Sequence, residues 1–461
     1  MTSTIVPQSK RWANAITNQL LWLKTNRLIR NLGTMGAAQL TIRFSRLFAT
    51  VMLSRLLLPQ DYGLSAIVLT VYEFISLFTR NGIAAKVVQA SDAEVEQVAN
   101  TAYRMTWIFC GGLVAVQLLL AVPIGWLYSD MRVAAPIALM SFIYFATPLC
   151  SMQGAFQQRE GRLGRFAFAS AAQVVVDNLL TAVFALFGLG LWAIILPKIL
   201  VAPIWVVVVR FGHPWRPQKN LPLLSMQGWK DIARFSRSVL GVELLTTLQA
   251  NIDNLLVGYF LGIQALGIYY FAFNAGLGIT QGLIFAAGIA IYPHLCEVRS
   301  QPLALRSRFR QTLRTMSLTM VPLIILQASF APIYVPIIFG AKWAPAIPVL
   351  SLICLSALAR PFAATCSQLL KAIGRPEIEL RWQLVNTILL IAALLVAAQF
   401  SIYWVGFAIF VIQTVFLSIF AIIIPSQVFN SNDAETKNIN DKEKEIPTTD
   451  KGFDVAETVW R

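Results

Sequence analysis

Charged side chains are scarce in this 461-residue chain, at 13% of the sequence, against about 25% in a typical soluble protein. Apolar residues make up 57%, and the mean hydropathy is +0.65. So few charges cannot cover the water-facing surface of a soluble protein of this length, which argues against soluble enzymes and soluble binding modules. Disorder of the whole chain is excluded because the apolar content is high. The composition therefore predicts a polytopic membrane protein.

Residues that hold metals or form disulfides are also few. The chain has two histidines, His213 and His294, and both adjoin predicted loops. None of its five cysteines forms a CxxC pair, and four lie in apolar runs. We interpret the cysteines as buried free thiols. No metal site and no cofactor are therefore expected.

Acidic residues are outnumbered, with 22 Asp and Glu against 37 Lys and Arg, which gives a net charge of +15. In a soluble protein this excess would suggest a nucleic-acid partner. Membrane proteins, however, gather Lys and Arg in their cytoplasmic loops. We therefore expect the lipid bilayer as a partner and no nucleic acid.

Long apolar runs fill most of the sequence. A helix needs about 20 apolar residues to cross the hydrocarbon core. Residues 254–296 carry no Asp, Glu, Lys or Arg over 43 positions, which is too long for one span, so we divide them at Leu261-Gly262-Ile263-Gln264. The sequence predicts an all-α polytopic fold with about twelve transmembrane helices at 33–57, 63–79, 102–127, 134–156, 167–187, 190–209, 238–261, 265–292, 315–338, 344–370, 382–398 and 402–425.

The distribution of Lys and Arg over the loops tests this count independently. With the amino terminus inside, the predicted cytoplasmic segments hold 29 of these residues, and the outer loops hold two, Arg132 and Lys342. Such asymmetry is expected of a correct topology. Both termini are then predicted to be cytoplasmic.

The longest and most basic loop divides six predicted helices from six. Short matches at an offset of about 210 residues, such as Gly161-Arg162 with Gly374-Arg375, favour a duplicated six-helix unit. We expect no cleaved signal peptide at the start, and read it as an amphipathic helix on the membrane surface or a partly disordered basic leader. The predicted parts are a cytoplasmic leader (1–32), an N-terminal lobe (33–209), an inter-lobe loop (210–237), a C-terminal lobe (238–425) and a disordered cytoplasmic tail (426–461).

Three stretches of the sequence carry a family resemblance. Residues 55–64 read RLLLPQDYGL, 157–166 read QQREGRLGRF, and 251–258 read NIDNLLVG, followed by LGIQALGIYY at 261–270. In these stretches the chain resembles Wzx-type oligosaccharide flippases, the polysaccharide-transport branch of the MOP exporter superfamily, and within it the exopolysaccharide and colanic-acid-type subgroup.

The resemblance implies two pseudo-symmetric six-helix lobes around a central cavity, as in MATE-like transporters, and alternating access. It implies a polyprenyl-pyrophosphate-linked oligosaccharide repeat unit as cargo, a place in the bacterial inner membrane, and glycan polymerase or export machinery as further partners.

Apart from Arg55 and Arg104, which lie near span ends, eight charged residues fall inside the predicted spans, where each costs about 2.5–3.5 kcal/mol at a helix centre. Arg43 and Arg46 are three residues apart and share one helix face. Guanidinium groups suit a pyrophosphate because they grip it with paired hydrogen bonds. The resemblance favours this substrate-binding role. The alternative is an interhelical pairing of these arginines with Glu73.

The other intramembrane charges leave similar alternatives open. Lys198 is a second candidate for the cavity, or else a structural partner of Asp177 on the preceding helix. Arg360 precedes Pro361, which combines a charge with a helix kink, and is the cavity candidate of the second lobe. Glu243 and Asp253 are predicted to present similar faces, for ion coupling or structural pairing.

Three functions compete. The leading hypothesis is a flippase for a lipid-linked oligosaccharide, and the alternative is a drug/cation antiporter of the same superfamily. A membrane polymerase or ligase of the glycan pathway would need a large outer loop rich in Arg and His. Every predicted outer loop here has about ten residues or fewer, without histidine. The sequence therefore predicts a transporter and not an enzyme.

Overall fold

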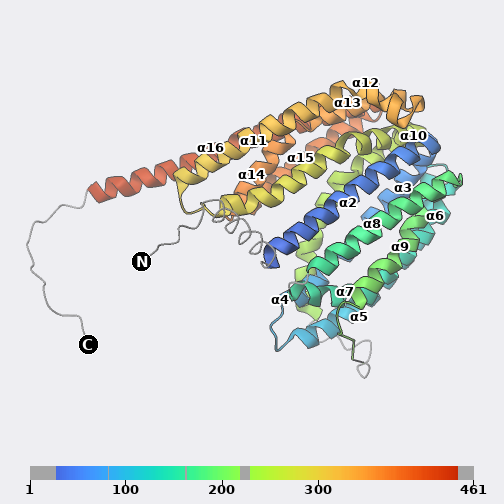
Figure 1. The fold of residues 1–461 in the computed structure, drawn as a ribbon, viewed down its shortest axis with the longest axis horizontal. Coiled ribbons are helices and arrows are strands. Elements are labelled where there is room, and N and C mark those ends of the chain that lie inside the picture. The colour runs from blue at the N-terminus through green and yellow to red at the C-terminus, as the bar shows by residue number, and fades with distance from the viewer. Residues whose placement is uncertain (1–26, 81, 161–162, 219–228, 445–461) are drawn as a thin grey trace, which may run out of the picture. The chain divides into compact units, whose positions relative to one another are not determined.

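The computed structural model describes residues 27–80, 82–160, 163–218 and 229–444, which fold into helices without any strand (Figure 1). The first-half helices are α2 (Arg27–Leu56), α3 (Pro59–Ser76), α4 (Ile83–Gln89), α5 (Val95–Leu127), α6 (Ala134–Met140), α7 (Ala146–Arg159), α8 (Leu163–Leu186) and α9 (Trp192–Arg210). The second-half helices are α10 (Trp229–Cys296), α11 (Pro302–Ser329), α12 (Ala331–Tyr334), α13 (Ile347–Ser356), α14 (Arg360–Ala372), α15 (Pro376–Ala397) and α16 (Ile402–Lys444).

Short 3₁₀- or π-helical segments connect several of these α-helices. They are η1 (Leu77–Arg80), η2 (Met131–Val133), η3 (Ser141–Phe145), η4 (Val335–Phe339) and η5 (Ala341–Ala346). The element η4 is a π-helix, and the other four are 3₁₀-helices.

Within the described residues, nine helices are long and apolar enough to cross a membrane, and ten if the bent pair Pro302–Ser329 with Ala331–Phe339 is one span. That pair bends by 50° where span 315–338 was predicted. Predicted span 33–57 is helical as part of α2 but is not among these candidates. Two predicted spans, 238–261 and 265–292, overlap the single candidate Leu240–Ile284. The all-α polytopic fold is confirmed, and the number of twelve spans stays a prediction.

The break between those two spans lies at a glycine. Gly262 has φ 84° and ψ 173°, a non-helical conformation inside α10. Glycine adopts such a conformation because it has no Cβ to clash. The break confirms the predicted turn at Leu261–Gln264.

A second break confirms another expectation. Helix α13 ends at Ser356 and α14 begins at Arg360, with Pro361 in the first turn. Proline fits there because the first backbone N–H groups of a helix have no intrahelical acceptor.

The predicted tail begins inside a helix. Helix α16 continues to Lys444 and so covers residues 426–444. Disorder of the tail stays a prediction. Polarity excludes a packed core but not a helix, and opposite charges four residues apart, such as Lys437 and Asp441, support one. Residues 445–461 lie outside the described residues, as does most of the predicted leader.

The chain forms two compact units. One comprises Met1–Ile279, Ile325–Leu355 and Thr387–Phe410, and the other comprises Thr280–Ile324, Ser356–Asn386 and Val411–Arg461. Their boundaries fall inside α10, α11, α15 and α16 and before the last residue of α13. The first unit therefore holds the whole predicted N-terminal lobe together with parts of the C-terminal one. The division into two six-helix lobes stays a prediction.

Each unit has its own apolar packing. In the first unit, α2 packs against α8, and α8 packs against α9 (Figure 1). In the second unit, Leu295, Phe309, Cys366, Leu369 and Ile424 belong to one buried cluster. The free thiol of Cys366 is buried among apolar side chains, as the sequence predicts.

Candidate functional site

Helix α2 carries the two arginines that the sequence singles out. Arg43 is half-buried and Arg46 is exposed. Glu73 lies on α3, and both helices belong to the first unit.

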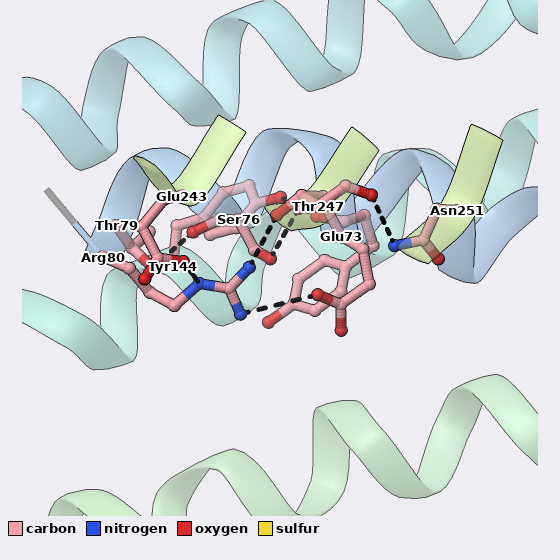
Figure 2. Close-up of polar contacts among 9 residues, drawn as sticks. Glu73, Ser76, Thr79, Arg80, Tyr144, Glu243, Thr247 and Asn251 are labelled. Carbon is pink, nitrogen blue, oxygen red and sulfur yellow. Dashed lines mark hydrogen bonds and ion pairs between the residues drawn. The ribbon is translucent and has the colours of Figure 1, made fainter. Parts of the chain in front are cut away.

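Arg80 joins two carboxylates from different helices (Figure 2). Its Nε lies 2.9 Å from Glu243 Oε2 on α10, and its Nη1 lies 3.6 Å from Glu73 Oε2. Its Nη2 also donates a hydrogen bond of 3.2 Å to the Thr247 hydroxyl. Glu73, expected as the alternative partner of Arg43 and Arg46, therefore has Arg80 as an ion-pair partner.

Sequence reasoning missed Arg80 because it assigned this residue to a cytoplasmic loop. One available signal was its spacing of seven residues from Glu73, which is about two helical turns. The contact with Glu243 spans 163 residues, and no local spacing predicts it.

Helix α10 presents a polar row toward this arginine. Glu243, Thr247 and Asn251 follow one another at intervals of four residues, so they share a face. The Asn251 amide donates a 3.1 Å hydrogen bond to the Thr247 carbonyl oxygen. Carboxylate, hydroxyl and amide groups in this arrangement can bind a polar or cationic group.

A buried polar contact supports the helix that carries Glu73. The hydroxyl of Tyr144 donates a 2.5 Å hydrogen bond to Gln117 Oε1, and the Gln117 amide donates one of 2.6 Å to the Ile137 carbonyl. The Tyr144 ring stacks on Tyr72, with ring centroids 5.6 Å apart and planes 5° from parallel. A satisfied buried network of this kind holds α3 in a defined position.

Asp253 has surroundings unlike those of Glu243. Its side chain is buried and accepts hydrogen bonds from the Tyr269 hydroxyl and, at 2.9 Å, from the Asn254 backbone N–H. These residues lie on both sides of the Gly262 break in α10. Asp253 therefore stabilises the break, whereas Glu243 pairs with Arg80. The two carboxylates have different roles although they were expected to present similar faces.

The remaining candidates lie apart from this cluster. Lys198 Nζ is 3.0 Å from Asp177 Oδ2, so the predicted structural pair between α9 and α8 forms. Arg360 is half-buried at the first residue of α14, in the second unit. Joint use of Arg360 with Arg43 and Arg46 stays a prediction.

Two of the family-motif stretches, 55–64 and 261–270, meet where α3 begins. A Cβ added to Gly63 would lie 1.9 Å from the Ile263 carbonyl oxygen, and one added to Gly267 would lie 1.7 Å from that of Pro59. Nearby, the Asp61 carboxylate accepts a 3.2 Å hydrogen bond from the Leu58 N–H and so caps α3. These motif residues let two backbones touch, and they act in packing rather than in binding.

The Arg80 cluster gives a prediction about stability. Its side chains are about a third to a half exposed, so each ion pair is worth only about 0.2–1 kcal/mol. We expect Glu243→Gln to lower the thermal midpoint in detergent slightly. Arg80→Ala should lower it more, because it leaves two carboxylates without their shared cation.

Arg132→Ala is the matched control, because Arg132 pairs with Asp130, two residues away, on an exposed turn. Equal midpoints for the Arg80 and Arg132 variants would show that the cluster does not hold α3 to α10.

No group of three or more His, Cys, Asp or Glu is placed to hold a metal ion among the residues described. The arrangement offers cations, carboxylates and hydroxyls for noncovalent binding.

Comparisons with known proteins agree with this picture. The model of a family described as "Polysaccharide biosynthesis protein" matches residues 52–348. The lipopolysaccharide biosynthesis protein WzxC of Escherichia coli (strain K12) is 24% identical over 85% of this chain and 78% of its own. The succinoglycan biosynthesis transport protein ExoT of Rhizobium meliloti (strain 1021) is 24% identical over 78% of this chain and 72% of its own.

Solved structures share the fold. The lipid II flippase MurJ, in an inward closed conformation, has a TM-score of 0.69 at 10% identity, covering 84% of this chain and 86% of its own. An inward-facing MATE multidrug transporter of the MOP superfamily has a TM-score of 0.63 at 14% identity, covering 85% and 98%. The family match covers more than half of the sequence, and the chain therefore belongs to this family of polysaccharide biosynthesis proteins.

Proposed function

We propose that the protein is a flippase that moves a polyprenyl-pyrophosphate-linked oligosaccharide repeat unit across the bacterial inner membrane for surface or exopolysaccharide assembly. The observation that carries the proposal is the polysaccharide-biosynthesis family match on a chain with the fold of a lipid II flippase. The name of ExoT, a transport protein of succinoglycan biosynthesis, supports it. In this proposal the protein acts as a transporter and not as an enzyme.

The cargo determines what the intramembrane charges do. A pyrophosphate carries negative charge into a medium of low dielectric constant, where cations bind it strongly. Arg43 and Arg46 are proposed to grip the pyrophosphate from α2, and Arg360 is a proposed cavity residue of the predicted C-terminal lobe. Lys198 takes a smaller part, because it already pairs with Asp177.

A drug/cation antiporter is the second candidate, favoured by the MATE-like fold and by the carboxylates of Glu73 and Glu243. Two assays separate the candidates. In a strain that lacks its own flippase, a flippase restores surface glycan when expressed with the matching glycan genes. An antiporter restores none, but raises resistance to cationic drugs.

Orientation in the membrane gives a further prediction. Reporter fusions after Asp61, Ile263 and Lys342 are expected to report the outer side, and fusions after Arg162, Lys219 and Arg375 the cytoplasm. The reason is the concentration of Lys and Arg in the predicted inner loops. A cytoplasmic signal at Ile263 would contradict both the split at Gly262 and the two-lobe arrangement.

A further inference from the structure

The end of α2 is bound to a segment almost 300 residues further along the chain. Arg55 Nε donates a 2.8 Å hydrogen bond to the Ile338 carbonyl, and its guanidinium also bonds that of Ile337. In return, Lys342 Nζ donates to the carbonyls of Arg55, at 2.9 Å, and Leu57, at 2.7 Å. We name this set the clasp, together with the Trp343 indole, which donates a 2.8 Å hydrogen bond to the Ser54 carbonyl.

The clasp is a reciprocal cap. Helix α2 ends at Leu56 and η4 ends at Phe339, and the last carbonyls of a helix lack intrahelical partners. Cations near a helix C-terminus satisfy such carbonyls and interact favourably with its negative end. Arg55 does this for η4, and Lys342 does it for α2. Neither segment has its end satisfied in this way unless the other is in place.

The part of the clasp beside the two cations is buried and apolar. Trp343 is fully buried and stacks on Phe271, with ring centroids 4.0 Å apart, while Tyr62 meets its edge at 4.9 Å. Ser54 has 0% of its surface exposed and Leu57 has 2%. The close approaches at Gly63 and Gly267 lie in the same region. Together these buried contacts exclude water from the part of the clasp around Ser54 and Trp343.

The cations are suited to release. Arg55 is exposed and Lys342 is half-buried, and both bond backbone carbonyls. If α2 and residues 337–343 separated, water could replace the carbonyl acceptors of both cations, and no unpaired carboxylate would be left buried. Lys342 is also one of only two Lys and Arg residues in the predicted outer loops. The other, Arg132, pairs with Asp130, whereas Lys342 is used across the joint.

We propose that the clasp is the releasable outer seal of the transport path, and that Arg55 and Lys342 are its positioning residues. The proposal rests on the proposed function, in which the cargo leaves on the outer side. The clasp joins α2, in the predicted N-terminal lobe, to residues 337–343, in the predicted C-terminal lobe, and both segments belong to the first compact unit. It is closed in this structure, and it opens when the two ends separate. Removing bonds that exist only in the closed state shifts the equilibrium toward the open one.

The test measures how fast a cysteine introduced into the buried part of the clasp reacts with a reagent from outside. Ser54→Cys changes one atom of a buried side chain and leaves the carbonyl that Trp343 uses. It is made in a protein whose five native cysteines are replaced, and whole cells are treated with a membrane-impermeant maleimide. We expect slow labelling of Ser54→Cys, and labelling faster by roughly tenfold when Arg55→Met and Lys342→Met are added, because the open state becomes more populated.

Matched controls exclude simpler explanations. Ser129→Cys lies on an exposed turn beside Asp130 and should label fast in every background. Arg132→Met removes the other outer cation and should leave the Ser54→Cys rate unchanged. Lys342→Arg keeps a cationic donor and should stay slow. An unchanged Ser54→Cys rate in the abundant Arg55→Met/Lys342→Met protein would overturn the proposal.

A second measurement covers the case in which the double variant fails to fold. Leu57→Cys and Lys342→Cys are joined by a short, reducible thiol cross-linker in the otherwise intact protein. Glycan export should stop on cross-linking and return on reduction, and full export from cross-linked protein would overturn the proposal. The labelling experiment needs no substrate, so it can fail or succeed independently of the flippase assignment.

Discussion

Replacing Arg43 and Arg46 together by alanine is expected to reduce glycan export to background while the protein stays abundant in the membrane. A charged side chain within a membrane span costs about 2.5–3.5 kcal/mol, so losing two of them should not impair insertion. Their removal takes from α2 the two cations that share one face. The cargo pyrophosphate would then enter the apolar interior without its principal counter-charges.

Substitution by lysine separates charge from geometry. Lysine keeps the positive charge but loses the planar fork that binds phosphate oxygens in pairs, so partial export is expected. Arg132→Ala, on an exposed turn, should export normally. Wild-type export from an abundant Arg43→Ala/Arg46→Ala protein would show that these arginines serve the packing of α2 and not the cargo.

Gly267→Val is expected to abolish export through loss of folded protein. A Cβ at this position would lie 1.7 Å from the Pro59 carbonyl oxygen, a backbone atom that cannot rotate away. The two backbones must separate, which would disturb the start of α3 and the buried Trp343 beside it. Membrane abundance and the thermal midpoint in detergent should both fall sharply.

Gly278 provides the matched control on the same helix, because a Cβ added there meets nothing within 4 Å. Gly278→Ala should be tolerated, and should stabilise α10 by up to about 1 kcal/mol because alanine favours helix more than glycine does. If Gly267→Val were as abundant and as stable as Gly278→Ala, the close contact between α3 and α10 would be wrong.

Much of the architecture follows from local sequence. The span lengths and the loop charges predict an all-α membrane protein, and a charge-free run too long for one helix predicts the break found at Gly262. The Lys198–Asp177 pair is also predictable, because adjacent helices bring the two residues together. Such features depend on spacing within a helix or between sequence neighbours.

The clusters that join distant segments could not be predicted in this way. Arg80 reaches Glu243 over 163 residues, and Lys342 reaches the Arg55 carbonyl over 287. Backbone carbonyls carry no sequence signature, so nothing marks Ile338 or Leu57 as an acceptor. A polar composition such as that of the tail lacks a core but can still form a helix, as α16 does to Lys444.

The most direct test of lipid-linked glycan transport uses purified protein in sealed vesicles. A polyprenyl-pyrophosphate-linked oligosaccharide is placed in the inner leaflet, and a lectin outside reports its arrival in the outer leaflet. The flippase assignment predicts lectin binding that rises with wild-type protein and not with Arg43→Ala/Arg46→Ala. Equal lectin binding with wild-type protein and with protein-free vesicles would contradict it.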